Sequence, residues 1–463
     1  MKLSSMAVFP MRDRRERRNP MRLPENVRML MARLRQAGYT AYAVGGCVRD
    51  TLMNRVPKDW DLCTSALPAD MQRVFAGERV LETGLKHGTL TVILGHEPYE
   101  ITTYRVDGAY TDHRHPDAVS FVDRVDGDLS RRDFTINAMA CGEDGAVLDF
   151  FGGREDLKAG IIRCVGDPEK RFGEDALRIM RALRFASRYD FAIEPETDRA
   201  IRSLYPTLDR VAGERIRVEL LGMLTGPGVG RMLRAYPEVL TFLIPCLKEE
   251  VGYDQKNPHH LFTLWEHTVR AVEEVPPDEV LRMTMLMHDC GKPAARITDE
   301  KGIGHYPGHQ AISARLTAPI LEKYRFDRAS SDRILRLVEA HDIPLSPDRK
   351  TMLRRLNRFG EEDLRALFDV HRADRIATGT RSPAHARERT QELNDALDAL
   401  LREHPCFSRK DLAVNGHDLM ALGFSGADIG RELDRLLEAV MDGQTENTRE
   451  ALLAESAKRR ADS

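Results

Sequence analysis

The chain has few cysteines, no long apolar run and almost no excess of one charge. Its seven cysteines lie at positions 47, 63, 141, 164, 246, 290 and 406, and no pair has the spacing of a metal site. We therefore expect reduced, mostly buried thiols. No run approaches the roughly 18 apolar residues of a membrane span, and the stretch near Met6 is too short for a signal peptide. We expect a cytoplasmic protein.

The charge balance limits how nucleic acid would be bound. Lys plus Arg is 70 and Asp plus Glu is 73, which gives a net charge of -3. A nucleic-acid partner must therefore meet a local basic surface rather than a global field. Nothing implies a protein partner or a membrane. A hydrophobic fraction of 42% and a charged fraction of 31% are typical of a soluble globular protein.

The length predicts a multidomain chain, because 463 residues are more than a domain with a single hydrophobic core usually contains. Strand-like runs such as "YTAYAV" and "LTVIL" alternate with helical stretches at first, and three- and four-residue apolar spacing dominates later. Nine of the fifteen histidines lie between His259 and His385. The predicted segments are a disordered basic arm at 1–22, a mixed α/β head at 23–151, a helical neck at 152–255, a histidine-rich domain at 256–404 and a helical tail at 405–463.

Paired carboxylates give the first chemical signal. Asp59 and Asp61 flank a tryptophan in "KDWDL", so in a strand they share one face about 7 Å apart. Glu100 in "YEITTYR" offers a third carboxylate. Such hard oxygen ligands suit Mg²⁺, and two such ions can activate a 3′-hydroxyl and stabilise a pyrophosphate leaving group. The alternative is a solvated edge strand with Lys58 and Arg49 as ion-pair partners.

A glycine pair precedes these carboxylates. Gly45 and Gly46 follow a predicted strand, where backbone amides can approach an anion without hindrance from Cβ, and Arg49 adds positive charge. Farther along, Asp175 and Arg178 are three apart and are expected on one face of the helix that they open. The Asp carboxylate accepts and the Arg guanidinium donates, so the pair matches an exocyclic amine beside an unprotonated ring nitrogen. Cytosine and adenine present these groups in that order, whereas uracil and guanine present the reverse. The alternative is a surface ion pair.

Together these motifs resemble the nucleotidyltransferase superfamily that contains DNA polymerase β. "RRDFTINAMA" at Arg131–Ala140, "GEDALRIMRALRFA" at Gly173–Ala186 and "ERIRVEL" at Glu214–Leu220 narrow the resemblance to class II tRNA nucleotidyltransferases, the CCA-adding enzymes and their poly(A) polymerase relatives. The resemblance covers Leu23 to Gly222. It implies a polymerase-β-like head, followed by helical domains.

The resemblance assigns further roles. Arg131, Arg132 and Asp133 match the motif credited with ribose recognition and triphosphate contact. A polar segment that includes Ala109–His115 resembles the loop that the family needs for the final A. CC-adding relatives lack part of that loop, so full CCA synthesis is favoured. The remaining residues expected to bind nucleotide are Lys58, Asn137, Arg181 and Arg184.

A second constellation lies among the histidines. An adjacent His-Asp pair followed by "GK", with further histidines on both sides and a later Asp, resembles the HD phosphohydrolase superfamily. Imidazole with carboxylate suits a transition metal such as Ni, Mn, Co or Fe, and the set suffices for a two-metal site. The alternative is a structural remnant. The predicted ligands are His267, His288, Asp289, His309, His341 and Asp374.

The sequence therefore predicts template-independent addition of C, C and A to the 3′ end of tRNA from CTP and ATP, with Mg²⁺ at Asp59 and Asp61. One alternative is an A-adding, CC-adding or poly(A)-adding relative. The other is an HD-type phosphohydrolase whose head only binds RNA.

Overall fold

The computed structural model describes residues 20–82, 84–85, 88–107 and 119–461. The chain divides into two compact units, Met1–Met232 and Leu233–Ser463. This boundary falls inside the predicted neck, and the finer division into segments stays a prediction. Most of the basic arm and the Ala109–His115 loop lie outside the described residues. Within the described ranges, no helix combines the length and the hydropathy needed to cross a membrane.

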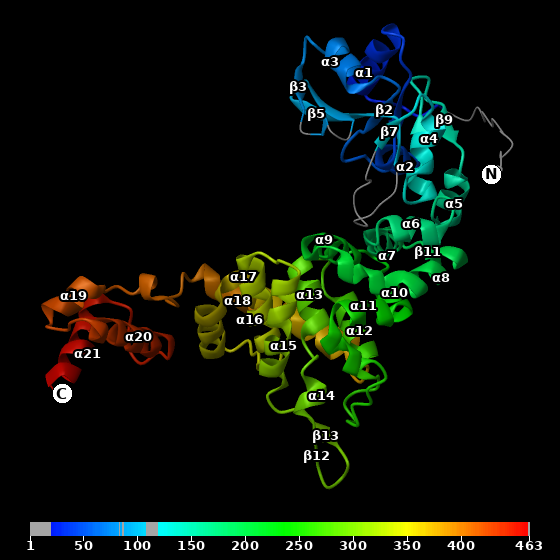
Figure 1. Cartoon of the computed structure of the whole chain (residues 1–463). Helices are drawn as coiled ribbons and strands as arrows, with labels where there is room; N and C mark the ends of the chain where they lie inside the picture. The colour runs from blue at the N-terminus through cyan, green and yellow to red at the C-terminus, as the bar shows by residue number, and fades with distance from the viewer. Residues whose placement is uncertain (1–19, 83, 86–87, 108–118, 462–463) are drawn as a thin grey trace. The chain divides into compact units, whose positions relative to one another are not determined.

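The N-terminal unit is built on a mixed sheet of seven strands in the order β3-β4-β5-β2-β1-β8-β9. Strands β2, β3, β5 and β9 of this sheet are labelled in Figure 1. Neighbours are antiparallel, except that β2 and β5 are parallel, with Leu62 opposite Ile101. The residues just before these two, Asp61 and Glu100, are therefore brought to the same level of the sheet. The strands are β1 (Ala41–Val44), β2 (Leu62–Thr64), β3 (Arg79–Leu81), β4 (Thr89–Leu94), β5 (Glu97–Thr103), β8 (Met139–Cys141) and β9 (Val147–Asp149).

The head core lies where helix α1 (Glu25–Gln36) packs against this sheet. Its buried residues, Val27, Leu30, Met31 and Leu34, recur at three- and four-residue spacing. They join strand residues of alternate positions in one apolar cluster. The other elements of the head are α2 (Gly46–Leu52), α3 (Pro68–Val74), β6 (Arg105–Asp107), β7 (Val119–Phe121), α4 (Val125–Ser130), the 3₁₀ turn η2 (Thr135–Asn137) and α5 (Gly153–Ala159).

Helices follow the head, as the sequence predicts. One boundary differs slightly from the prediction. The helix that was expected to begin at Asp175 begins at Leu177, and Asp175 lies in the short break between two helices. Helix α6 ends at Glu174 and α7 begins at Leu177, and Oδ1 of Asp175 accepts a hydrogen bond from the Leu177 amide at 3.0 Å. The elements are β10 (Ile161–Ile162), α6 (Pro168–Glu174), α7 (Leu177–Tyr189), β11 (Ala192–Ile193), α8 (Pro195–Leu204), η3 (Tyr205–Arg210), α9 (Gly213–Leu224) and α10 (Val229–Ala235), which contains the boundary.

The described part of the C-terminal unit is helical apart from the β12–β13 hairpin. Side-chain caps from Thr263, Asp278, Asp327 and Asp348 satisfy amides at the starts of α12, α13, α16 and α17. The elements are α11 (Pro237–Leu243), η4 (Pro245–Glu250), α12 (Leu264–Glu274), α13 (Glu279–Met287), α14 (Lys292–Ala295), β12 (Ile297–Thr298), β13 (Gly304–His305), α15 (His309–Lys323), α16 (Arg328–Ala340), α17 (Arg349–Ala377), α18 (Pro383–Arg402), η5 (Arg409–Asp411), α19 (Gly416–Ala421), α20 (Ala427–Met441) and α21 (Arg449–Ala461).

Candidate active sites

Three carboxylates meet at the end of the head sheet. Asp59 and Asp61 lie on the segment just before β2, whereas Glu100 lies on the neighbouring strand β5. Burial and the nearby carboxylates of Asp59 and Glu100 raise the pKa of Asp61 to about 6, and Arg132 opposes this shift. The three carboxylates therefore share one electrostatic environment that a cation would relieve. Their ligand atoms are not all within 4.8 Å of one another.

The glycine turn beside these carboxylates accommodates an arginine. Gly45 has φ of +82°, and a Cβ at this position would lie 2.8 Å from Nη1 of Arg132. Only glycine allows both the backbone conformation and the close approach. Gly46 begins helix α2. The structure therefore brings the predicted glycine pair and Arg132 together, whereas the predicted Lys58 is exposed.

Arg49, predicted to contact the triphosphate, lies in a buried network of polar contacts. Its side chain is buried, its Nη1 donates to Oδ1 of Asn137 at 2.5 Å, and its guanidinium lies over the ring of Tyr189 at 5.0 Å. Nδ2 of Asn137 donates to Oδ1 of Asp133 at 3.1 Å. Arg49 therefore takes part in a buried network that links the head to α7, and its predicted triphosphate contact stays a prediction.

Asp133 is the centre of this network. Oδ2 accepts two hydrogen bonds from Arg181, at 2.8 and 2.6 Å, and Oδ1 accepts from the Phe134 amide and from Asn137. Burial alone would raise the pKa of Asp133, but Arg181 and Asn137 hold it at about 2. Its four acceptor positions are filled, so ribose recognition by Asp133 would need one of these bonds to break. Arg184 pairs with Glu219 at 2.5 Å.

The predicted base-reading residues do not pair with each other. Oδ2 of Asp175 lies 2.8 Å from Nη2 of Arg215, and Nη1 of Arg178 lies 2.7 Å from Oε2 of Glu174. The simple surface ion pair between Asp175 and Arg178 is therefore not formed. Glu174 and Arg215 both lie in the quoted motifs, but no residue pattern in the sequence marks either of them as a site residue.

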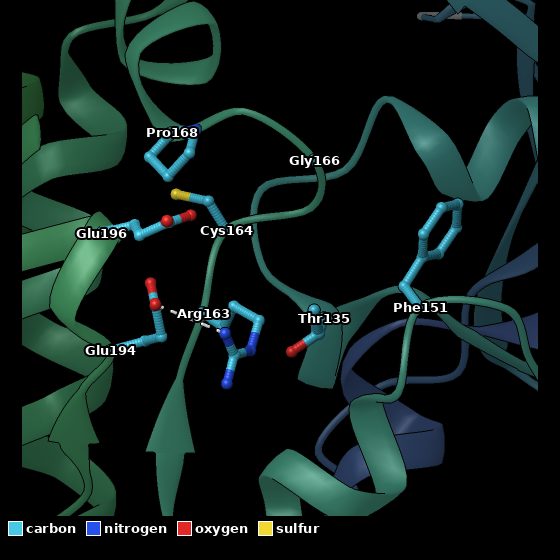
Figure 2. A pocket seen from close by; sticks show the side chains of 8 residues that line it. All are labelled: Thr135, Phe151, Arg163, Cys164, Gly166, Pro168, Glu194 and Glu196. Atoms are coloured by element: carbon cyan, nitrogen blue, oxygen red, sulfur yellow. Dashed lines mark ion pairs between the residues drawn. The ribbon is translucent and has the colours of Figure 1, made fainter. Parts of the chain in front are cut away.

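A separate cavity of about 140 Å³ in the N-terminal unit contains none of the predicted site residues. Arg163 on its wall is already paired with Glu194 at 3.4 Å (Figure 2). It also pairs with Asp156 at 3.0 Å. We assign no ligand to it. The lining residues are Thr135, Phe151, Arg163, Cys164, Gly166, Pro168, Glu194 and Glu196.

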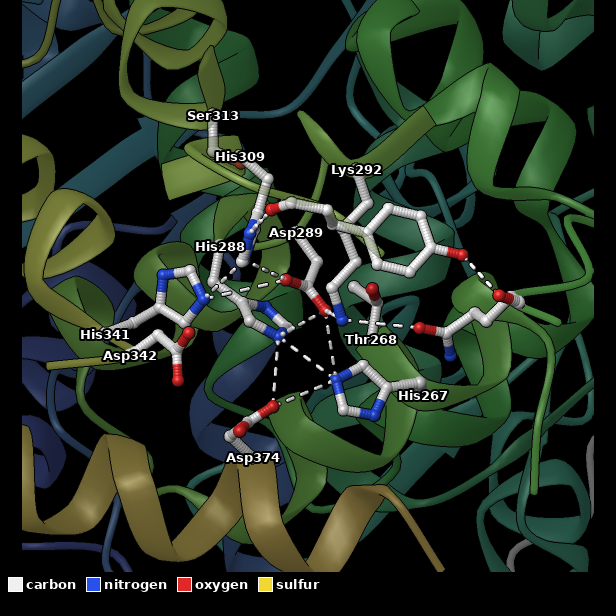
Figure 3. A network of polar contacts seen from close by, with 12 residues as sticks. His267, Thr268, His288, Asp289, Lys292, His309, Ser313, His341, Asp342 and Asp374 are labelled. Carbon is white, nitrogen blue, oxygen red and sulfur yellow. Dashed lines mark hydrogen bonds and ion pairs between the residues drawn. The ribbon is translucent and has the colours of Figure 1, made fainter. Parts of the chain in front are cut away.

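The six predicted ligands of the C-terminal unit converge on one buried centre (Figure 3). They form two sets that share Asp289. In the first set, Nε2 of His267 lies 3.2 Å from Oδ2 of Asp289 and 3.1 Å from Oδ1 of Asp374. In the second, Nε2 of His309 lies 3.2 Å from Oδ1 of Asp289. The members are His267, His288, Asp289 and Asp374 in the first set and Asp289, His309 and His341 in the second.

The hydrogen bonds of the imidazoles fix which nitrogen faces this centre. Nδ1 of His288, His309 and His341 lies 2.7 to 2.8 Å from a main-chain carbonyl oxygen. A carbonyl only accepts, so Nδ1 carries a proton and Nε2 is the nitrogen that faces the centre. Nε2 of His309 and Nε2 of His341 are only 3.2 Å apart. Two converging Nε2 atoms beside a carboxylate fit a metal ion.

The carboxylates determine the charge of one ring when no metal is bound. Burial would lower the pKa of His288, but Asp289 and Asp374 raise it to about 10, so a metal would have to displace the proton on Nε2 of this ring. Nζ of Lys292, which the motif "HDCGK" supplies, lies 2.6 Å from Oδ2 of Asp289. A cavity of about 360 Å³ opens beside the cluster, and its walls include three cations, Lys292, Arg375 and Arg381, and three carboxylates, Asp289, Asp342 and Asp374.

Three segments of the chain match family models. Residues 41–163 match the poly A polymerase head domain, residues 190–248 a probable RNA and SrmB-binding site of polymerase A, and residues 312–455 a putative domain 2 of tRNA nucleotidyltransferase. The first segment contains the carboxylates, the glycine turn and Arg132. Fold and site together define a nucleotidyltransferase, as predicted.

The relatives narrow this class. The chain is 33% identical over 431 residues to the CCA-adding enzyme of Enterococcus faecalis, covering 92% of this chain and 93% of the relative. The CCA-adding enzyme of Lactobacillus gasseri is 48% identical over 222 residues, which is 48% of this chain and 54% of that one. The crystal structure of the Bacillus stearothermophilus CCA-adding enzyme in complex with CTP superimposes with a TM-score of 0.73 at 31% identity, covering 94% of this chain and 96% of that one. The chain belongs to the family of CCA-adding enzymes.

Proposed function

We propose that the N-terminal unit adds C, C and A to the 3′ end of tRNA, using CTP and ATP. The observation that carries this proposal is the group of three carboxylates beside the glycine turn and Arg132. Burial, and after it the repulsion from Asp59 and Glu100, raises the pKa of Asp61, and a bound catalytic cation would relieve that repulsion. The similarity of nearly the whole chain to CCA-adding enzymes supports the same reaction.

Each residue has a role in this reaction. Asp59 and Asp61 would hold Mg²⁺, which supplies Lewis-acid activation of the 3′-hydroxyl and charge neutralisation at the pyrophosphate. Gly45, Gly46 and Arg132 bind the triphosphate through backbone amides and a guanidinium. Glu100 adds negative charge beside the pair.

Base choice is assigned to the junction of α6 and α7. The Asp175 carboxylate accepts from the exocyclic amine of cytosine or adenine, and the Arg178 guanidinium donates to the ring nitrogen. Uracil and guanine present the reverse order, so each would leave polar groups unpaired. Arg215 holds Asp175 in place, and Glu174 holds Arg178.

A primer-extension experiment tests this function. Purified protein is incubated with tRNAs that lack CCA, CA or A, each nucleotide is offered singly with Mg²⁺, and the products are sequenced. Full activity gives C, C and A in that order. Addition of A alone, of CC alone or of a homopolymer would establish one of the narrower activities instead, and no addition would contradict the proposal.

We also infer a metal-dependent phosphohydrolase in the C-terminal unit. The specific observation is the convergence of Nε2 atoms and carboxylates on two sets that share Asp289. Nitrogen and oxygen donors in this mixture favour a transition metal over Mg²⁺. His267, His288 and Asp374 would hold one ion and His309 and His341 a second, and the metal supplies an activated water.

Reciprocal variants test this second activity. Elemental analysis of the purified protein and a panel of phosphate monoesters and cyclic nucleotides, with Ni, Mn or Co added, measure metal content and hydrolysis. Asp289→Ala should abolish hydrolysis and spare nucleotide addition, and Asp61→Ala should do the opposite. Wild-type protein that contains no metal and hydrolyses nothing would identify the cluster as a structural remnant.

A further inference from the structure

A buried carboxylate lies beneath the nucleotide site, and the proposed mechanism does not use it. Asp128, in helix α4, is 1% exposed. Its Oδ1 accepts hydrogen bonds from Nε and Nη2 of Arg131, at 3.0 and 2.8 Å, and from the Arg105 amide at 3.4 Å. Its Oδ2 lies 3.4 Å from Nη2 of Arg132. One buried anion therefore holds two adjacent arginines.

The two arginines are held in different ways. Arg131 turns both Nε and Nη2 toward Asp128, so the carboxylate occupies that edge of its guanidinium. Arg132 gives only Nη2 to Asp128, and its Nη1 approaches within 2.8 Å of the place where a Cβ on Gly45 would stand. Nε of Arg132 is buried and finds no hydrogen-bond partner among the residues that the structure describes. Asp128 therefore determines where the guanidinium of Arg132 stands beside the glycine turn.

We propose that Asp128 is a positioning residue for the triphosphate, which acts by holding Arg132 against the glycine turn. This inference rests on the proposed nucleotide addition. The triphosphate is common to CTP and ATP, so loss of Asp128 affects both nucleotides alike. Loss of a base-reading residue would instead change the choice between nucleotides.

The test compares Asp128→Asn with Asp126→Asn. Asp126 lies on the same helix, but it is paired with Arg124 at an exposed position, so it is a matched control. The KM and kcat are measured for CTP on tRNA lacking CCA and for ATP on tRNA ending in CC. Asp128→Asn should raise both KM values at least about fivefold, because it removes a charge-assisted anchor, and should leave nucleotide preference unchanged. Asp126→Asn should match the wild type.

A double-mutant cycle then separates positioning from general damage. In an Arg132→Ala background, adding Asp128→Asn should change KM less than about twofold, because the group through which it acts is already gone. If Asp128→Asn is insoluble, Asp128→Glu keeps the charge, displaces the arginines and enters the same cycle. Equal KM changes in both backgrounds, or a lower melting temperature with unchanged KM, would overturn the inference. A wild type that adds neither C nor A would refute the proposed function itself.

Discussion

Replacing Asp61 with asparagine should make the N-terminal unit more stable and inactive at the same time. In the absence of divalent ions, burial and the carboxylates of Asp59 and Glu100 raise the pKa of Asp61 from 3.8 to about 6. Two pKa units correspond to about 3 kcal/mol, and partial exposure reduces this to roughly 1–2 kcal/mol. Asparagine carries no charge and escapes this penalty.

The sign of the effect depends on pH. The folded pKa lies above the unfolded value, so the ionised carboxylate destabilises the fold, and the penalty develops as pH rises from about 3.8 to about 6. Asp61→Asn should therefore equal the wild type near pH 3.5 and exceed it above pH 6. For a unit of this size, the melting temperature should rise by roughly 2–8 °C.

Differential scanning calorimetry in EDTA measures this shift, with Asp126→Asn as the control for an exposed carboxylate. Adding Mg²⁺ should stabilise the wild type and leave Asp61→Asn unchanged, since the variant lacks a ligand. The same preparation should incorporate no nucleotide. An unchanged or lower melting temperature above pH 6, an equal response to Mg²⁺, or near-normal incorporation would each refute the reasoning.

Three further predictions follow from the other contacts. Asp133→Asn should lower the free energy of unfolding of the N-terminal unit by roughly 2–3 kcal/mol at pH 7, because the folded pKa of about 2 lies below the unfolded value of 3.8. Urea unfolding measures this loss, which should shrink as pH falls through 3.8 toward 2. A difference that does not change with pH would contradict the prediction. Asp175→Ala should lower the ratio of C to U incorporation by roughly 10-fold or more when each nucleotide is offered singly. Arg215→Ala should lower the same ratio by less, because it only removes the partner of Asp175. An unchanged ratio would show that the base is read by other residues. Asp289→Ala should lose bound transition metal by elemental analysis while CCA addition survives, and retained metal would count against the shared ligand.

The sequence was sufficient for features that depend on local spacing. Alternating β-type runs predicted β4 and β5, and three- and four-residue apolar spacing predicted the helices that follow the head. Glycine and carboxylate motifs identified the nucleotidyltransferase class, which the family models confirm. The sequence also named all six side chains that the structure brings together around Asp289, because a metal site needs residue types that few other sites collect, and their role as ligands stays a prediction.

Tertiary structure decided how those residues are partnered. No spacing rule reveals that Arg215, on α9, rather than Arg178 pairs with Asp175, or that Arg181 donates to Asp133, since these bonds join segments far apart in the chain. Asp128 could be predicted only in part. Its spacing of three and four residues from Arg131 and Arg132 is visible in the sequence, but the burial of its side chain is known only from the structure. The sequence determines which polar side chains are present and which face of a helix or strand they share. Packing removes water from some of these side chains, and because a buried polar group without a hydrogen bond is costly, packing decides which of them must pair with one another.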